Sequence, residues 1–202
     1  MDREKSTSPS DTLTEVCRLT VICAFISFAG WCLEKVGRYI LYSDTADRGF
    51  LTLPLCPIYG ISVVATFLLC GTPPHIRGIV GSKIRKTALW QGAVKNNILL
   101  KYIFYFLFVT IVSTLAELIV GLTAKAFGVT LWDYSQQAFN LFGVICLSFS
   151  LIWGVLITAF MALGWKPLYM LIHRIPVPIV KRTTFTISFA VLTDFLVNLI
   201  LL

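Results

Sequence analysis

"RGFLTLPLCPIYG", residues 48–60, combines two prolines, a cysteine and two glycines, and from Gly49 to Pro74 the chain runs for 26 residues without a charge. Pro54 and Pro57 each lack a backbone N–H and clash with the preceding turn, so a regular helix cannot run through residues 53–57. Pro57 suits the first turn of a helix, with Cys56 just before it. Non-helical backbone at membrane depth persists only where protein or a water-filled cavity receives its polar groups. The stretch therefore predicts the mouth of a membrane-embedded site, with a purely architectural bend at the prolines as an equal alternative.

The composition is that of an integral membrane protein. Of its 202 residues, 57% are hydrophobic and 13% are charged, whereas about a quarter of the residues in a soluble domain are charged. A helix that crosses the bilayer core needs about 20 apolar residues. We therefore expect an all-α membrane protein with about five transmembrane helices, near residues 19–42, 55–71, 98–122, 139–165 and 183–202. These helices would form one domain, residues 16–202, after a disordered cytoplasmic tail, residues 1–15.

Basic residues concentrate in two of the predicted connections. Residues 72–97 hold five basic residues and no acid, and residues 166–182 hold four and no acid. The other two connections, 43–54 and 123–138, hold one basic residue each. The positive-inside rule places the basic connections in the cytoplasm, which puts the N-terminus inside and the C-terminus outside. The net charge of +7 is thus assigned to topology and to contacts with anionic lipids of the bilayer, and no nucleic-acid partner is expected.

The acidic residues give the more useful signal, because five of them fall on the outer half of this topology: Glu34, Asp44, Asp47, Glu117 and Asp133. An ionisable residue at membrane depth costs up to about 3 kcal/mol and often marks function. Glu117 has no basic neighbour at helical spacing, so we interpret it as a functional residue. For Glu34, a functional role and a structural ion pair with Arg38, one turn later, are equally supported. Asp194 and Asn198 share a face of the last helix, which predicts a structural hydrogen bond between helices.

An internal similarity relates the two halves of the chain. In each half a helix with an acid near its end (Glu34, Glu117) is followed by an outer connection and by a helix with a cysteine near its start (Cys56, Cys146). Two helix pairs in the same orientation would form a parallel repeat. The sequence leaves open whether these two cysteines form a disulfide or remain two free thiols. The six cysteines show no CxxC motif and no metal-ligand spacing with a histidine, so no metal site is predicted.

Two blocks of the sequence resemble a known family. They are "GWCLEKVGRYILYSDTADRGFLTLPLCPIYG" (30–60) and "AELIVGLTAKAFGVTLWDYSQQAFNLFGVICLSFSLIWG" (116–154). Both are similar to the signature blocks of the ABC-transporter type IV family, the CmpB-like group of small bacterial membrane proteins. The resemblance covers about residues 20–165. It implies a multi-pass permease of the cell membrane, in a bacterium the cytoplasmic membrane.

The resemblance also implies a substrate or ion site. Carried over position by position, the candidate residues of this site are Glu34, Arg48, Cys56, Tyr59, Glu117, Asp133, Tyr134 and Asn140. In "WDYS" (132–135), Asp133 and Ser135 also suit an Asx-type turn, so a rigid cap on this connection is an equal alternative. The sequence departs from the family at Val144, where the second block of the family has an arginine. Any role of that arginine is vacant here or has moved to Arg48 or Arg38.

Three classes of function remain open. The first is a transport component with an acidic, outward-facing site for a cation, a proton or a polar solute. The chain has no GxxxxGK[ST] loop, so ATP-driven transport requires a separate ATP-binding subunit, with residues 72–97 as the expected contact surface. The second is an intramembrane enzyme or lipid-handling protein with paired carboxylates, assisted by Cys56 or Tyr134. The third is a non-catalytic membrane partner. No cofactor is expected, and a homodimer is an open alternative.

Overall fold

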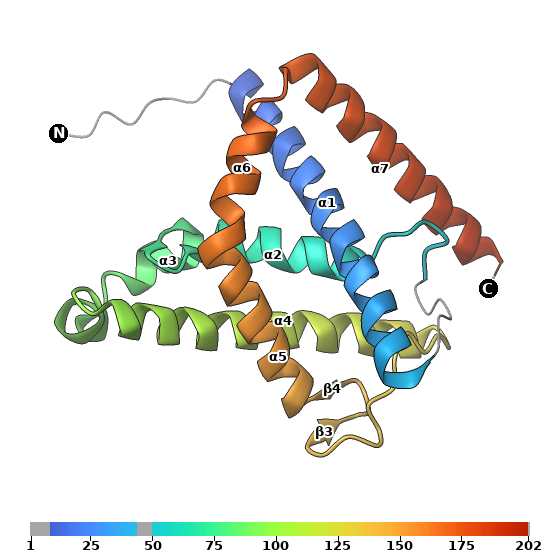
Figure 1. Cartoon of the computed structure of the whole chain (residues 1–202), viewed down its shortest axis with the longest axis horizontal. Helices are drawn as coiled ribbons and strands as arrows, with labels where there is room; N and C mark the ends of the chain where they lie inside the picture. The colour runs from blue at the N-terminus through green and yellow to red at the C-terminus, as the bar shows by residue number, and fades with distance from the viewer. Residues whose placement is uncertain (1–8, 44–49, 202) are drawn as a thin grey trace.

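The computed structural model describes residues 9–43 and 50–201, and helices dominate it (Figure 1). The helices are α1 (Pro9–Tyr42), α2 (Pro57–Cys70), α3 (Gly78–Ile84), α4 (Ile98–Ala126), α5 (Leu147–Ala159), α6 (Trp165–His173) and α7 (Val177–Ile200). Two π-helical turns are η1 (Trp90–Val94) and η2 (Phe160–Gly164). Two short antiparallel hairpins pair β1 (Gly71–Thr72) with β2 (His75–Ile76), and β3 (Asn140–Leu141) with β4 (Ile145–Cys146).

Four helical segments are long and apolar enough to cross a membrane, and they are Pro9–Gly37, Ile98–Ala126, Leu147–His173 and Val177–Ile200. The predicted all-α membrane fold is therefore confirmed. The remaining predicted span, residues 55–71, corresponds to α2, which has 14 residues. At 1.5 Å per residue its length is about 21 Å, which is shorter than the bilayer core of about 30 Å. The sidedness of the membrane and the parallel repeat stay predictions.

The helix break predicted from the prolines is confirmed. Residues 51–56 are not helical, and α2 begins at Pro57, with Cys56 in extended conformation just before it. The second glycine of the opening stretch then lets α2 approach α1 closely. A Cβ on Gly60 would meet the carbonyl oxygen of Cys23 and the side-chain oxygen of Ser27. The backbones of α1 and α2 are therefore packed without a side chain between them at this point.

Several element boundaries differ from the predictions. Helix α1 begins at Pro9, so residues 9–15 of the predicted disordered tail are helical. The predicted fourth span begins at residue 147 instead of 139, because Phe139, Phe142 and Gly143 have positive φ angles and turn the chain into the β3–β4 hairpin. At its other end this span continues through η2 to the end of α6, and α7 already begins at residue 177. Hydropathy marks only the most apolar part of a helix, whereas these helices continue into more polar sequence.

The helices cross each other instead of forming a parallel bundle. Figure 1 shows α2 alongside α4, while α1 and the continuous α5–α6 helix cross them. The core lies where these helices meet, and Tyr105 of α4 is fully buried there, donating a hydrogen bond of 2.7 Å to the carbonyl oxygen of Gly71. Helix α7 packs against α1 at the edge. The end of α4 and the start of α2 lie on the same side of the molecule, opposite α3.

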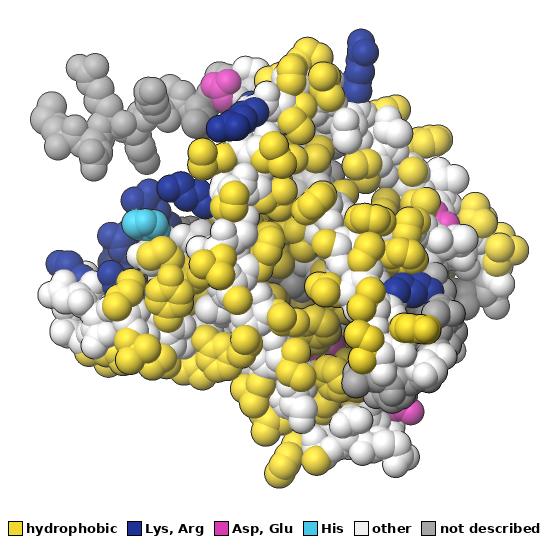
Figure 2. Space-filling view, viewed as in Figure 1, with side chains coloured by type: hydrophobic (Ala, Val, Ile, Leu, Met, Phe, Trp, Pro, Cys, Tyr) yellow, Lys and Arg dark blue, Asp and Glu magenta, His cyan; other side chains and the backbone are white. Residues whose placement is uncertain are grey.

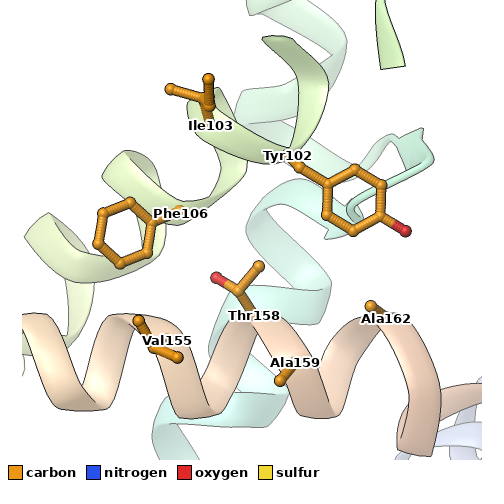
Figure 3. Close-up of a pocket in the computed structure, with 7 residues that line it drawn as sticks. All are labelled: Tyr102, Ile103, Phe106, Val155, Thr158, Ala159 and Ala162. Atoms are coloured by element: carbon orange, nitrogen blue, oxygen red, sulfur yellow. The ribbon is translucent and has the colours of Figure 1, made fainter. Parts of the chain in front are cut away.

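Hydrophobic side chains cover much of the surface in Figure 2, as a bilayer environment requires. A cavity of about 350 Å³ opens on this surface between α4 and the α5–η2 helix (Figure 3). Its lining is apolar except for Tyr102 and Thr158, and it contains no charged side chain. This cavity therefore differs in character from the acidic site, which lies at the ends of α1 and α4.

Candidate functional site

The centre of the candidate site is Glu117, on the inner face of α4. The buried residues of that helix recur every fourth position, namely Tyr105, Val109, Ser113, Glu117 and Gly121, so the glutamate belongs to the stripe that faces the protein. Only 6% of its surface is exposed. One carboxylate oxygen, Oε1, accepts a hydrogen bond of 3.1 Å from the hydroxyl of Tyr134. The other, Oε2, is buried and has no hydrogen-bond partner among the described residues.

Tyr134 is held in place by the loop that follows α4. Its backbone N–H donates to the carbonyl oxygen of Gly143 at 2.8 Å, and its ring stacks on Phe149 of α5 with centroids 4.8 Å apart. Burial, reinforced by the carboxylates of Glu117 and Glu34, raises the pKa of Tyr134 above its usual value. The hydroxyl therefore stays protonated at neutral pH and serves as a donor to the Glu117 carboxylate.

Asp133 and Asn140 fold this loop. The Asp133 carboxylate accepts hydrogen bonds from the backbone N–H of Ser135, at 2.9 Å, and from its hydroxyl. These bonds lower the pKa of the exposed Asp133 below its usual value. Asn140 donates to the carbonyl oxygens of Ser135 and Gln137 at 3.2 and 2.8 Å, and accepts from the N–H of Gly143 at 3.2 Å. Asp133 thus makes the turn that the sequence offered as the alternative to a binding role, and Asn140, for which no such role was predicted, fixes the same loop.

Glu34 and Tyr59 approach the same region from α1 and α2. The hydroxyls of Tyr59 and Tyr134 both lie within electrostatic range of Glu34 and Glu117. The ring of Tyr59 packs directly over α1, because a Cβ on Gly30 would meet it. Glu34 is exposed, in contrast to Glu117. The structure therefore brings two carboxylates and two phenols together where α1, α2 and α4 converge.

The remaining predicted residues have different positions. Cys56 lies immediately before α2, and its backbone N–H donates to the carbonyl oxygen of Ser27 at 3.1 Å. Cys146 holds the corresponding position before α5 and is buried. The two thiols are not joined in a disulfide. Arg48 lies outside the described residues.

Val144 of the β3–β4 hairpin packs against Gly121, which lies one helical turn beyond Glu117 on α4. Val144 is 1% exposed, and a Cβ on Gly121 would meet its side chain. This is the position at which the resembled family has an arginine. In the described part of the chain, Glu117 forms no ion pair with a lysine or an arginine. The side chain of Arg38, the predicted partner of Glu34, lies outside the described residues.

Two aromatic residues of the site were missed from the sequence. Phe149 stacks on Tyr134, and Trp153 meets the ring of Tyr59 edge-on with centroids 5.0 Å apart. Both are half-buried and come from α5. They lie four residues apart within the second signature block, and that spacing places them on one helix face. Aromatic residues in an apolar span are nevertheless too common for this spacing to indicate a site.

The arrangement is suited to binding a positive charge or a hydrogen-bond donor. A buried carboxylate is costly unless it is paired, and here one of its two oxygens has no partner within residues 9–43 and 50–201. Figure 2 shows an acidic side chain at the bottom of a hollow rimmed by hydrophobic side chains. A proton, a cation or a donor group of a solute would satisfy the unpaired oxygen.

Comparison with known proteins identifies the family. The family model described as "Putative ABC-transporter type IV" matches residues 21–199. No curated protein and no solved structure matches the chain. The matched region runs from the first turns of α1 almost to the end of α7 and includes every described residue of the acidic site. The chain therefore belongs to the ABC-transporter type IV family.

Proposed function

We propose that this protein is the membrane-spanning component of a transport system, with a solute site centred on Glu117 and open to the outer face. The observation that carries the proposal is the Oε2 atom of Glu117, which is buried without a hydrogen-bond partner in the described structure. A carboxylate kept only for packing is expected to have both oxygens satisfied. The family description, which names a transporter, supports the same function.

The partner expected for such a component is an ATP-binding subunit on the cytoplasmic side. The connection between α2 and α4 supplies an exposed basic surface there, formed by Arg77, Lys83, Arg85, Lys86 and Lys95. Blue side chains gather over the α3 region in Figure 2. Positive charge on cytoplasmic connections is also a topology signal. The basic surface therefore supports the position of the subunit, and the family supports its existence.

The first test is native mass spectrometry of the full chain, released gently from its own membrane. Co-release of a nucleotide-binding subunit, lost when Arg85 and Lys86 are both changed to glutamate, supports the transport system. A chain that is always released alone, while a membrane-reconstituted sample shows no uptake, contradicts it.

The second test concerns the site itself. Glu117→Gln keeps the size of the side chain and removes its charge, so folded protein is expected at the usual level while uptake is lost. The matched control is Glu15→Gln, which changes a carboxylate at the opposite end of α1. Loss of folded protein in Glu117→Gln alone would assign the glutamate to helix packing and would favour the non-catalytic membrane partner.

A further inference from the structure

Four aromatic rings are associated with the acidic site, two through the phenols near Glu117 and Glu34 and two through their packing on those phenols. They form two pairs, Tyr134 with Phe149 and Tyr59 with Trp153, whose centroids are 4.8 and 5.0 Å apart. All four rings are half-buried, so each pair leaves part of its surface open. The Tyr134 hydroxyl contacts Glu117 directly. The side chain that bonds the Glu117 carboxylate therefore belongs to an aromatic pair.

The acidic character of the site favours a cation. The carboxyl groups of Glu117 and Glu34 belong to it, and no described lysine or arginine forms an ion pair with Glu117. Val144, beside Gly121 on α4, supplies only an apolar surface. A cation or a hydrogen-bond donor satisfies the buried carboxylate of Glu117, whereas an anionic solute would add a second negative charge in a low-dielectric setting, at a high energetic cost.

Aromatic faces favour one class of cation. A quaternary or alkylated ammonium group gains attraction over the face of tryptophan or tyrosine and binds in aromatic cages of this kind. A metal ion such as Ca²⁺ instead requires six to eight oxygen ligands. The described residues contain no group of three or more His, Cys, Asp or Glu side chains placed to hold a metal. The site thus offers one unpaired carboxylate oxygen and aromatic surface, which matches an organic ammonium group.

The chain makes the same type of contact nearby. The ammonium group of Lys35, the residue after Glu34, lies 5.5 Å from the centroid of the Trp31 ring. This distance is within the range of about 6 Å for a cation–π interaction. The outer end of α1 therefore already stabilises one ammonium group on an aromatic face.

We infer that the Glu117 site binds an organic cation through a quaternary or alkylated ammonium group, with Glu117 as the counter-charge and the Tyr134–Phe149 and Tyr59–Trp153 pairs as the aromatic walls. This inference rests on the proposed transport function and names the chemical class of its solute.

The test is equilibrium binding of radiolabelled choline to the full chain in lipid nanodiscs. Tetramethylammonium, the smallest quaternary ammonium, is expected to compete. The neutral competitor is 3,3-dimethylbutan-1-ol, which has the shape of choline with carbon in place of nitrogen, and it is expected to bind about tenfold more weakly or worse, because it lacks the charge. Equal competition by the neutral alcohol, or no binding of either ammonium compound, overturns the inference.

Variants assign the binding to this site. Glu117→Gln is expected to weaken choline binding about tenfold or more. Phe149→Leu removes one aromatic wall without touching the carboxylate and is expected to weaken it by about three- to thirtyfold. The matched control is Phe185→Leu, because Phe185 also belongs to a stacked pair, with Phe189 on the exposed side of α7. Unchanged choline binding in Phe149→Leu would contradict the claim that the aromatic pairs contact the ammonium group, even if the Glu117 variant fails to fold.

The inference and the transport function fail in distinguishable ways. Uptake of a neutral solute or of an inorganic cation that is lost in Glu117→Gln retains the transport function and overturns the ammonium class. Uptake that proceeds normally in a folded Glu117→Gln protein overturns both.

Discussion

Asp194 and Thr52, which are 142 residues apart in the sequence, are joined by a hydrogen bond of 2.8 Å from the backbone N–H of Thr52 to Oδ2 of Asp194. The same oxygen accepts from the N–H of Leu53 at 3.1 Å, and Asn198 one turn later donates to the Thr52 hydroxyl at 3.1 Å. Helix α7 thus supplies partners for backbone that cannot pair within a helix, since Pro54 follows directly. The last helix positions the chain that leads into α2 and the site.

Replacing Asp194 with alanine should release this segment. The two N–H groups would lose their acceptor, at a cost of about 1 to 3 kcal/mol in the free energy of unfolding, and amide exchange at Thr52 and Leu53 should accelerate. Hydrogen–deuterium exchange with mass spectrometry measures this directly. Asn198→Ala, which leaves both backbone bonds intact, is the control and should have a smaller effect. Equal exchange in Asp194→Ala and the unmodified protein would show that the segment is held by other contacts.

The close packing of α1 and α2 predicts a strong effect at Gly60. Valine there would drive its Cβ into the carbonyl oxygen of Cys23, and backbone atoms cannot move aside as a flexible side chain can. Overpacking of this kind costs about 1 to 3 kcal/mol, so Gly60→Val should lower the melting temperature in detergent.

The matched control for this variant is Gly37→Ala on α1. A Cβ at that position meets nothing within 4 Å, and alanine is favoured over glycine in a helix by about 1 kcal/mol. The control should therefore melt at the same or a higher temperature. A Gly60→Val protein that melts like the control would mean that α1 and α2 are further apart than the structure has them.

The sequence predicted the apolar helices and the break before Pro57, because both depend on local properties, hydropathy and the missing N–H of proline. It did not predict the β3–β4 hairpin, since "FNLFGVIC" (139–146) is as apolar as a span and its turn depends on Asn140 bonding to Ser135 and Gln137. For Asp194 it predicted a bond to another helix, whereas the partner is the loop backbone at Thr52.

The same distinction between local and long-range effects applies to the site. Glu117 was singled out because a charge in an apolar span is a local signal. The aromatic walls were not, because Phe149 and Trp153 acquire a role only when α5 packs against Tyr134 and Tyr59. Long-range contacts of this kind leave no period or motif in the sequence.

The loop that carries Tyr134 should depend on pH through Asp133. Hydrogen bonds from Ser135 hold the pKa of Asp133 below its usual value of 3.8. A carboxylate with a lowered folded-state pKa stabilises the fold above its unfolded pKa, and this contribution is lost as the pH falls through the lower, folded value. Amide protection of Ser135 should therefore be constant from neutral pH to about pH 4 and decrease below it.

Exchange measured at several pH values, corrected for the intrinsic rate, checks this prediction for the loop. Asp133→Ala removes the acceptor and should abolish the protection of Ser135 at every pH. Protection that falls instead between pH 7 and pH 5 would point to a histidine or to another group and would contradict a role for Asp133.

The opposite end of the molecule contains a second polar cluster, which should connect α1 to α6. Glu15 accepts from the Tyr169 hydroxyl at 2.7 Å through Oε1, and its Oε2 lies 3.1 Å from Nε2 of His173. The other ring nitrogen, Nδ1, lies 2.9 Å from the carbonyl oxygen of Tyr169. Both nitrogens of His173 thus lie within hydrogen-bond distance of oxygen acceptors on α1 and α6.

A double-mutant cycle with Glu15→Gln and His173→Gln measures this connection. The side chain of Glu15 is 36% exposed, so the coupling energy should be about 0.2 to 1 kcal/mol, as for ion pairs near the surface, and it should decrease as salt increases. Tyr169→Phe in the same background keeps the contact between Glu15 and His173 and should leave the coupling in place. A coupling energy that does not change with salt would show that the two residues interact through packing alone.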